Sequence, residues 1–181
     1  LALGMEEGEL ARRWTEQGEL RHSSGWQVTQ LPSSGLTLPP RQDQPSPAPG
    51  PQLLYGEHTD YDGFTFLWRS RSNGLEALLE GSWRQVPLLQ HSPDSILVNL
   101  GDLMEVWTGG VWRSPRHRVL RTASQGAGQE DLVSIVWFAG PHPSTRLVAL
   151  PSPLLPPQQA GRVLTAGQHV RDKIHRTAQN S

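Results

Sequence analysis

Short apolar segments separated by turn residues run through the middle of the chain, and this pattern predicts β-strands. Aromatic and branched side chains gather in five segments, at 64–68, 75–79, 83–86, 95–100 and 133–138. Glu80 and Gly81 lie between two of these segments as a hairpin turn would. No stretch between the strands suits a helical crossover, so we predict an all-β core, a sandwich or jelly roll of two facing sheets.

Helical patterns occur near the two ends of the chain. Residues 5–18 place acidic side chains before Arg12 and Arg13, the polarity that suits a helix dipole, and 165–177 predict a closing helix capped by Thr165. We divide the chain into four parts. They are an N-terminal helix with the first strand (1–30), a Pro/Ser-rich loop (31–52), a jelly-roll core (53–150), and a Pro-rich loop with the C-terminal helix (151–181).

Composition and charge narrow the possible partners. The 181 residues make 20.0 kDa, enough for one domain to bury a core without disulfide or metal staples. A formal charge of −1 provides no field for nucleic acid or an anionic membrane, and no apolar run is long enough to span a bilayer. The absence of Cys is compatible with a reducing compartment, so a cytoplasmic location is the expectation. The oligomeric state is not predicted.

Candidate chemistry begins with His58, Thr59 and Asp60. Alternate residues of a strand face the same side, so the imidazole of His58 and the carboxylate of Asp60 can point together into a barrel. His117, on a later strand, can add a third ligand. Two His and one carboxylate form the facial triad that is typical of non-haem Fe(II) oxygenases. By itself the His-x-Asp spacing favours a polar pair on a solvent-facing strand, so the sequence context must decide.

Five motifs in a fixed order give this triad a context. They are the His-Thr-Asp segment at 58–60, a Gly-Leu hairpin at 74–78, Asn-Leu-Gly-Asp at 99–102, Trp-Thr-Gly-Gly at 107–110 and Ser-Pro-Arg-His-Arg-Val at 114–119. Together they resemble the 2-oxoglutarate and Fe(II)-dependent dioxygenase superfamily, in its isopenicillin N synthase-like branch. The opening residues are similar to the stretch before that family's catalytic barrel, so its N-terminal helical region is expected upstream of Leu1.

The resemblance implies a double-stranded β-helix and a specific chemistry. His58, Asp60 and His117 would be both the metal ligands and the catalytic residues, and Ser134 would contact the cosubstrate. Fe(II), 2-oxoglutarate and O₂ would together hydroxylate or desaturate a small organic substrate, whose identity the sequence does not reveal. Arg118, Asn99 and Asp102 are interpreted as framework. Arg118 follows a ligand on a strand and so points to the opposite face, and Asn or Asp beside Gly commonly ties a turn through its own side chain.

The chain departs from this family at one position. The family holds the far carboxylate of 2-oxoglutarate with an Arg-x-Ser motif, and here Leu132 stands in place of the Arg while Ser134 is kept. Three other arginines lie near predicted strands and could supply the cation: Arg69, Arg71 and Arg121. The departure leaves two alternatives open, namely a metal-binding jelly-roll module without 2-oxoglutarate turnover, or an Fe(II)/O₂ oxidase that does not use 2-oxoglutarate.

Tryptophan side chains are the remaining candidates for the interior. Seven Trp are present, and such residues more often fill a core than form a ligand cage. Trp68 and Trp137 belong to predicted strands and are candidates to line the barrel.

Overall fold

The computed structural model describes residues 4–14, 25–31, 52–70, 74–88, 94–121, 132–155 and 163–179. In these ranges the chain forms three helices and eight strands. The helices are α1 (Glu9–Trp14), α2 (Asp102–Trp107) and α3 (Ala166–Gln179). The strands are β1 (Gly25–Leu31), β2 (Gln52–His58), β3 (Phe64–Arg69), β4 (Leu75–Leu79), β5 (Ser82–Gln85), β6 (Leu97–Leu100), β7 (His117–Arg121) and β8 (Leu132–Ala139).

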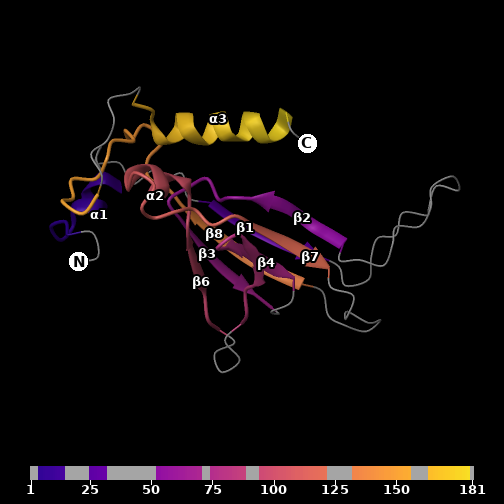
Figure 1. Cartoon of the computed structure of the whole chain (residues 1–181). Coiled ribbons are helices and arrows are strands. Elements are labelled where there is room, and N and C mark those ends of the chain that lie inside the picture. Colours follow the sequence, from indigo (N-terminus) through magenta and orange to yellow (C-terminus); the bar gives the residue numbers. More distant parts are fainter. Residues whose placement is uncertain are drawn as a thin grey trace, which may run out of the picture.

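The strands form two facing four-stranded sheets. One sheet has the order β1-β8-β3-β6 and the other the order β2-β7-β4-β5, and every neighbouring pair is antiparallel. Apart from the β4–β5 hairpin, consecutive strands cross from one sheet to the other, which is the connectivity of a jelly roll. Figure 1 shows the two layers with α3 running along one side of them, and α1 and α2 toward one end. The predicted all-β core is confirmed.

The hairpin predicted at Glu80 and Gly81 is present. Leu79 pairs with Ser82, and the two turn residues have positive φ angles of 50° and 78°, as the tightest hairpin turn requires. The predicted loop 31–52 is too wide, because Leu31 ends β1 and Gln52 begins β2. The rest of that loop, and positions 15–18 of the predicted first helix, lie outside the described residues. The division of the chain into four parts stays a prediction.

The sequence pattern did not predict α2, although this helix is the centre of the hydrophobic core. Leu103, Met104 and Trp107 are fully buried and pack with Leu147 and Leu150 from the segment after β8. Six helical residues are too few to show a periodicity, and the sequence of residues 99–102 predicts a turn instead. The core therefore lies at one end of the sheets, and the space between them is left for a pocket.

The C-terminal helix α3 begins as predicted. Thr165 Oγ1 accepts a hydrogen bond from the Gln168 amide at 3.3 Å, and Gln168 Oε1 accepts one from the Thr165 amide at 3.0 Å, a reciprocal capping box. Ala166, in the first turn, packs into the core. This end of α3 is thus fixed to the body of the fold. Within the described ranges, no helix has the length and apolar character needed to cross a membrane.

Candidate metal centre

His58, Asp60 and His117 converge at one end of the space between the sheets. Asp60 Oδ1 lies 3.8 Å from His58 Nε2 and 3.6 Å from His117 Nε2, and the two imidazole centroids are 4.2 Å apart. His58 is the last residue of β2 and pairs across the sheet with His117, the first of β7. Asp60 follows the end of β2, so the expectation that it shares a strand face with His58 is wrong. The turn after the strand directs its carboxylate instead.

In both His58 and His117, the ring nitrogen that faces away from Asp60, Nδ1, forms a hydrogen bond with a backbone carbonyl. His58 Nδ1 is 2.8 Å from Gly56 O and His117 Nδ1 is 3.0 Å from Pro115 O, so each Nδ1 carries the proton and donates. Burial lowers the pKa of His58 below its usual range, which keeps this ring neutral at pH 7. Both Nε2 lone pairs therefore face the Asp60 carboxylate, an arrangement of three acceptors that a cation would stabilise.

The donor set and its dimensions suit a divalent transition metal. Two atoms that bind one ion at about 2.1 Å can be at most about 4.2 Å apart, and both His–Asp distances, 3.6 and 3.8 Å, are shorter than that limit. The three side chains can form a metal-binding group whose ligand atoms all lie within 4.8 Å of one another. Two imidazoles and one carboxylate on one side of an ion are the ligands of a facial triad.

Two side chains from neighbouring strands fix the orientation of the Asp60 carboxylate. Thr65 Oγ1 on β3 donates to Asp60 Oδ2 at 2.6 Å, and Asn99 Nδ2 on β6 donates to the same oxygen at 2.7 Å. Asp60 is only 6% exposed, so these bonds are protected from water. With Oδ2 occupied in this way, Oδ1 is turned toward the two imidazoles and is the oxygen presented to a metal.

We predict that Thr65→Val lowers Fe(II) affinity by about tenfold or more without unfolding the protein. Valine keeps the shape of threonine but removes the hydroxyl that holds Oδ2, and loss of such a support typically weakens metal binding by about 10–100-fold. Anaerobic Fe(II) titration measures the change. The matched control is Thr145→Val, because Thr145 is equally buried and lies outside the site. Equal affinities of the two variants would show that Thr65 does not support the site.

Backbone amides at the start of α2 hold the turn that carries Asp60. The amides of Gly101, Asp102 and Leu103 donate to the carbonyls of Gly63, Asp60 and Asp62, at 2.8, 2.9 and 3.1 Å. A Cβ on Gly101 would lie 2.2 Å from Asp62 O, so this close approach admits only glycine. The Asn-Leu-Gly-Asp segment is therefore framework, as predicted. Its backbone hydrogen bonds, however, stabilise the turn that carries Asp60, which is distant in sequence, and not a local turn within residues 99–102.

The helix α3 contacts the same turn through one lysine. Lys173 Nζ donates to Thr59 Oγ1 and to Asp102 Oδ2, and His169 Nε2 lies 3.6 Å from that carboxylate oxygen. Burial alone would raise the pKa of Asp102, but the contacts with His169, Lys173 and Thr59 outweigh it and hold the pKa well below the usual range. The Lys173–Asp102 ion pair thus fixes α3 beside Thr59, the residue between His58 and Asp60.

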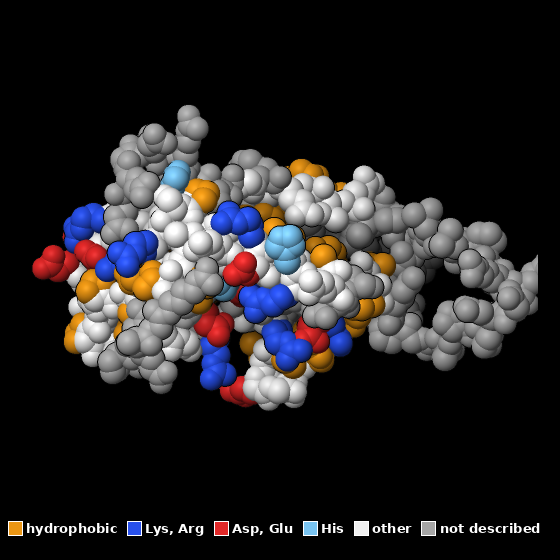
Figure 2. Space-filling model, turned by 90° about the horizontal axis from the view of Figure 1, so that it is seen from above, with side chains coloured by type: hydrophobic (Ala, Val, Ile, Leu, Met, Phe, Trp, Pro, Cys, Tyr) orange, Lys and Arg blue, Asp and Glu red, His pale blue; other side chains and the backbone are white. Residues whose placement is uncertain are grey.

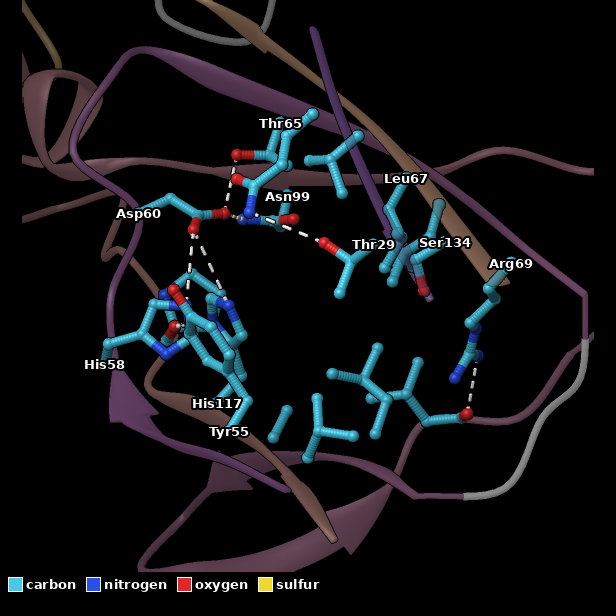
Figure 3. Close-up of a pocket in the computed structure, with 18 of the residues that line it drawn as sticks. Thr29, Tyr55, His58, Asp60, Thr65, Leu67, Arg69, Asn99, His117 and Ser134 are labelled. Atoms are coloured by element: carbon cyan, nitrogen blue, oxygen red, sulfur yellow. Dashed lines mark hydrogen bonds and ion pairs between the residues drawn. The ribbon is translucent and has the colours of Figure 1, made fainter. Parts of the chain in front are cut away.

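A pocket extends from the metal centre between the two sheets. Its volume is about 280 Å³, and alternate residues of the strands line it, including Thr65, Leu67 and Arg69 of β3. Figure 3 shows the triad at one end of this pocket and Arg69 with Ser134 at the other. Trp68 and Trp137 are not among its lining residues, so they do not line the barrel. The alternation places them on the other face of their sheet, where Trp137 packs against Phe66 with ring centroids 5.2 Å apart.

Two of the residues considered as contacts for the cosubstrate line the pocket. Ser134 lines the pocket, and so does Arg69, one of the three arginines named above. Arg71 and the side chains of Leu132 and Arg121 lie outside the described part of the molecule. Arg118 belongs to the framework, because its side chain donates to Glu76 at 2.9 Å and its guanidinium carbon lies 4.1 Å from the centre of the Trp83 ring.

Sequence reasoning missed the residues that support the ligands from a distance. Thr65 stands beside Asp60 only because β3 folds back from the metal turn, and Lys173 meets Thr59 across 114 positions of sequence. Asn99 had been identified, but with a local role. The role of Thr65 could have been predicted from the sequence. A strand that directly follows the turn with a metal ligand presents alternate residues to the same side as that ligand, and Thr65 is at such a position on β3.

Comparisons with known proteins were made on sequence and on structure. A family profile described as the 2OG-Fe(II) oxygenase superfamily matches residues 36–141. Validamycin A dioxygenase of Streptomyces hygroscopicus subsp. limoneus is 45% identical over 105 residues, which are 57% of this chain and 28% of that protein. The 1-aminocyclopropane-1-carboxylate oxidase 1 of Cucumis melo is 36% identical over 126 residues, or 68% of this chain and 37% of that protein.

A comparison with solved structures supports the jelly-roll fold. JOX2, crystallised with 2OG, Fe and JA, aligns with a TM-score of 0.67 at 22% identity, over 92% of this chain and 43% of that one. At this identity the similarity concerns the fold alone. The chain spans about a third of the length of the two curated relatives that it matches.

Proposed function

The chain belongs to the 2OG-Fe(II) oxygenase superfamily, and on that premise we propose that it carries the active site of a non-haem Fe(II) and 2-oxoglutarate-dependent dioxygenase. The reaction is the oxidation of a small organic substrate with O₂, by hydroxylation or desaturation. Family membership confirms the resemblance inferred from the motifs, and Fe(II) and 2-oxoglutarate are the cofactor and cosubstrate in the family's name.

The observation that carries this proposal is the convergence of two Nε2 lone pairs and one carboxylate oxygen. Asp60 Oδ1 lies 3.6 and 3.8 Å from the imidazole nitrogens, and every other polar atom of the three side chains has a partner in the protein. His58, Asp60 and His117 would hold Fe(II), and one face of the ion would stay open for other ligands. The bound iron supplies the oxidative chemistry.

The residues around the triad orient the reactants and limit access of water. Thr65 and Asn99 keep one Asp60 oxygen occupied, so the carboxylate offers the metal a single oxygen. The pocket walls beyond the triad are largely apolar side chains, which exclude water from the reacting centre. Ser134 of β8 lines the pocket and would donate a hydrogen bond to the cosubstrate.

A small substrate fits the dimensions of the pocket. A volume of about 280 Å³ lies just below the usual range for small-molecule sites, about 300–1,000 Å³. The relatives named above are an oxygenase of validamycin A and an oxidase of 1-aminocyclopropane-1-carboxylate, both small organic molecules. Basic and acidic side chains are interspersed on the face of the molecule that Figure 2 presents, without one large field of either sign.

Anaerobic reconstitution with Fe(II), followed by 2-oxoglutarate, tests the proposed function. A keto acid that chelates the iron is expected to produce a weak visible absorption, and admission of O₂ is expected to release succinate. Iron-bound protein without this absorption at millimolar 2-oxoglutarate would contradict the proposal. That result would favour an Fe(II)/O₂ oxidase if a substrate is still consumed, or a binding module if none is.

A further inference from the structure

Arg69 places a buried guanidinium on the wall of the pocket, away from the metal centre. This residue ends β3, is 4% exposed, and is the single Lys or Arg among the described side chains that line the pocket. Figure 3 shows it facing the pocket at the end opposite His58 and His117. A positive group in this position is unusual in a largely apolar pocket, and it predicts an anionic group on the molecule that binds there.

Strand register places the Ser134 hydroxyl beside Arg69 and the Thr29 hydroxyl beside Ser134. Ser134 on β8 pairs directly with Arg69 on one side and with Thr29 of β1 on the other. Directly paired residues project their side chains to the same face of a sheet, and all three residues line the pocket. Thr29, Ser134 and Arg69 therefore form a row of hydrogen-bond donors across three neighbouring strands.

The guanidinium is held in place by the backbone after β5. Arg69 Nη2 donates to Val86 O at 2.6 Å and to Pro87 O at 2.9 Å. Burial lowers the pKa of Arg69 from its usual range, yet arginine stays charged at neutral pH. A cation fixed in this way loses little side-chain entropy when it binds a carboxylate, which makes it a suitable anchor.

The distance from the metal centre suits a dicarboxylic keto acid. Thr65, which contacts Asp60, and Arg69 lie on the same face of β3, four residues or about 13 Å apart along the strand. A five-carbon keto acid held at the metal centre would extend along this face toward Arg69. The carboxylate of 2-oxoglutarate that points away from the iron would then lie between the guanidinium and Ser134.

We propose that Arg69 on β3 binds the far carboxylate of 2-oxoglutarate, in place of the arginine that the family carries where this chain has Leu132. The inference rests on the proposed function. It explains how a chain without the Arg-x-Ser arginine keeps a cation next to the retained Ser134: the charge comes from the neighbouring strand instead of from the same one.

Binding of two keto acids to Arg69→Gln tests this inference. The ligands are 2-oxoglutarate and 2-oxopentanoate, which has the same metal-binding end but no far carboxylate, and binding to anaerobic Fe(II)-loaded protein is measured by calorimetry. We expect wild type to prefer 2-oxoglutarate. Arg69→Gln should weaken 2-oxoglutarate binding by about 10–100-fold, the range for a lost charge-assisted pair, and leave 2-oxopentanoate affinity within about twofold.

Two further variants make the result decisive. Arg84→Gln removes an exposed arginine of β5 that does not line the pocket, and it should leave both affinities unchanged. Arg69→Lys keeps a charge but not the planar fork, so it should lower the preference for 2-oxoglutarate at least threefold, and it decides the matter if Arg69→Gln does not fold.

An unchanged preference in the folded Arg69 variant would overturn the assignment of Arg69. That outcome differs from failure of the proposed function, in which iron-loaded wild type binds neither keto acid.

Discussion

Replacement of His117 by alanine is expected to abolish tight iron binding while leaving the protein folded. The variant keeps only His58 and Asp60 of the three converging ligands, and loss of a direct ligand should cost more than the roughly 100-fold upper value for loss of a supporting residue. Among the described residues, the hydrogen-bond partner of His117 Nδ1 is the nearby Pro115 carbonyl, so removal of the ring breaks a local hydrogen bond and none between distant strands. Iron content after anaerobic loading and desalting measures the effect, and circular dichroism reports the fold.

A second histidine provides the control for this experiment. His142 is partly buried and bonds Ser144 Oγ at 2.7 Å in the segment after β8, outside the pocket. His142→Ala should retain iron at the wild-type ratio. If His117→Ala also retains it, the assignment of the ligands is wrong, whatever the family of the protein.

Replacement of Trp107 by alanine is expected to reduce the free energy of unfolding by about 3–5 kcal/mol. The Trp107 side chain is fully buried at the centre of the core, with its ring 5.7 Å from that of Trp14 between centroids. Alanine leaves a cavity that the helices and sheets around α2 cannot fill. Because domains of this size have about 5–15 kcal/mol of stability in total, the loss should be plain in chemical denaturation.

Two other substitutions calibrate that loss. Trp107→Phe keeps most of the ring and removes an indole N–H that is buried without a partner among the described residues, so it should cost much less than Trp107→Ala. Val98→Ala, at a side chain that is 51% exposed on β6, should change stability by less than about 0.5 kcal/mol. A loss below about 1 kcal/mol for Trp107→Ala would show that α2 is not the centre of the core.

The sheets and the ligands could be predicted from the sequence because their signals are local. Clusters of apolar side chains marked β3, β4 and β8, and Gly81 in the turn after β4 suits its positive φ angle. The helix α2 had no such signal, since six residues do not establish a period. Its burial depends on segments around Leu147 that follow much later in the chain.

The support of the metal centre could not be predicted for a similar reason. Asn99 is 39 positions from Asp60 in sequence, and Lys173 is 71 from Asp102, so these contacts exist only after the sheets and α3 have come together. Arg69 is an intermediate case. The sequence named it as one of three candidates, and the register of β3 against β8 then placed it beside Ser134.

The most direct test of the central claim is the position of iron in crystals of the Fe(II)-loaded protein, measured by anomalous scattering at the iron edge. The account predicts one peak at about 2.0–2.2 Å from His58 Nε2, Asp60 Oδ1 and His117 Nε2. A peak bound by other residues, or none at these three in protein shown to contain iron, would contradict it.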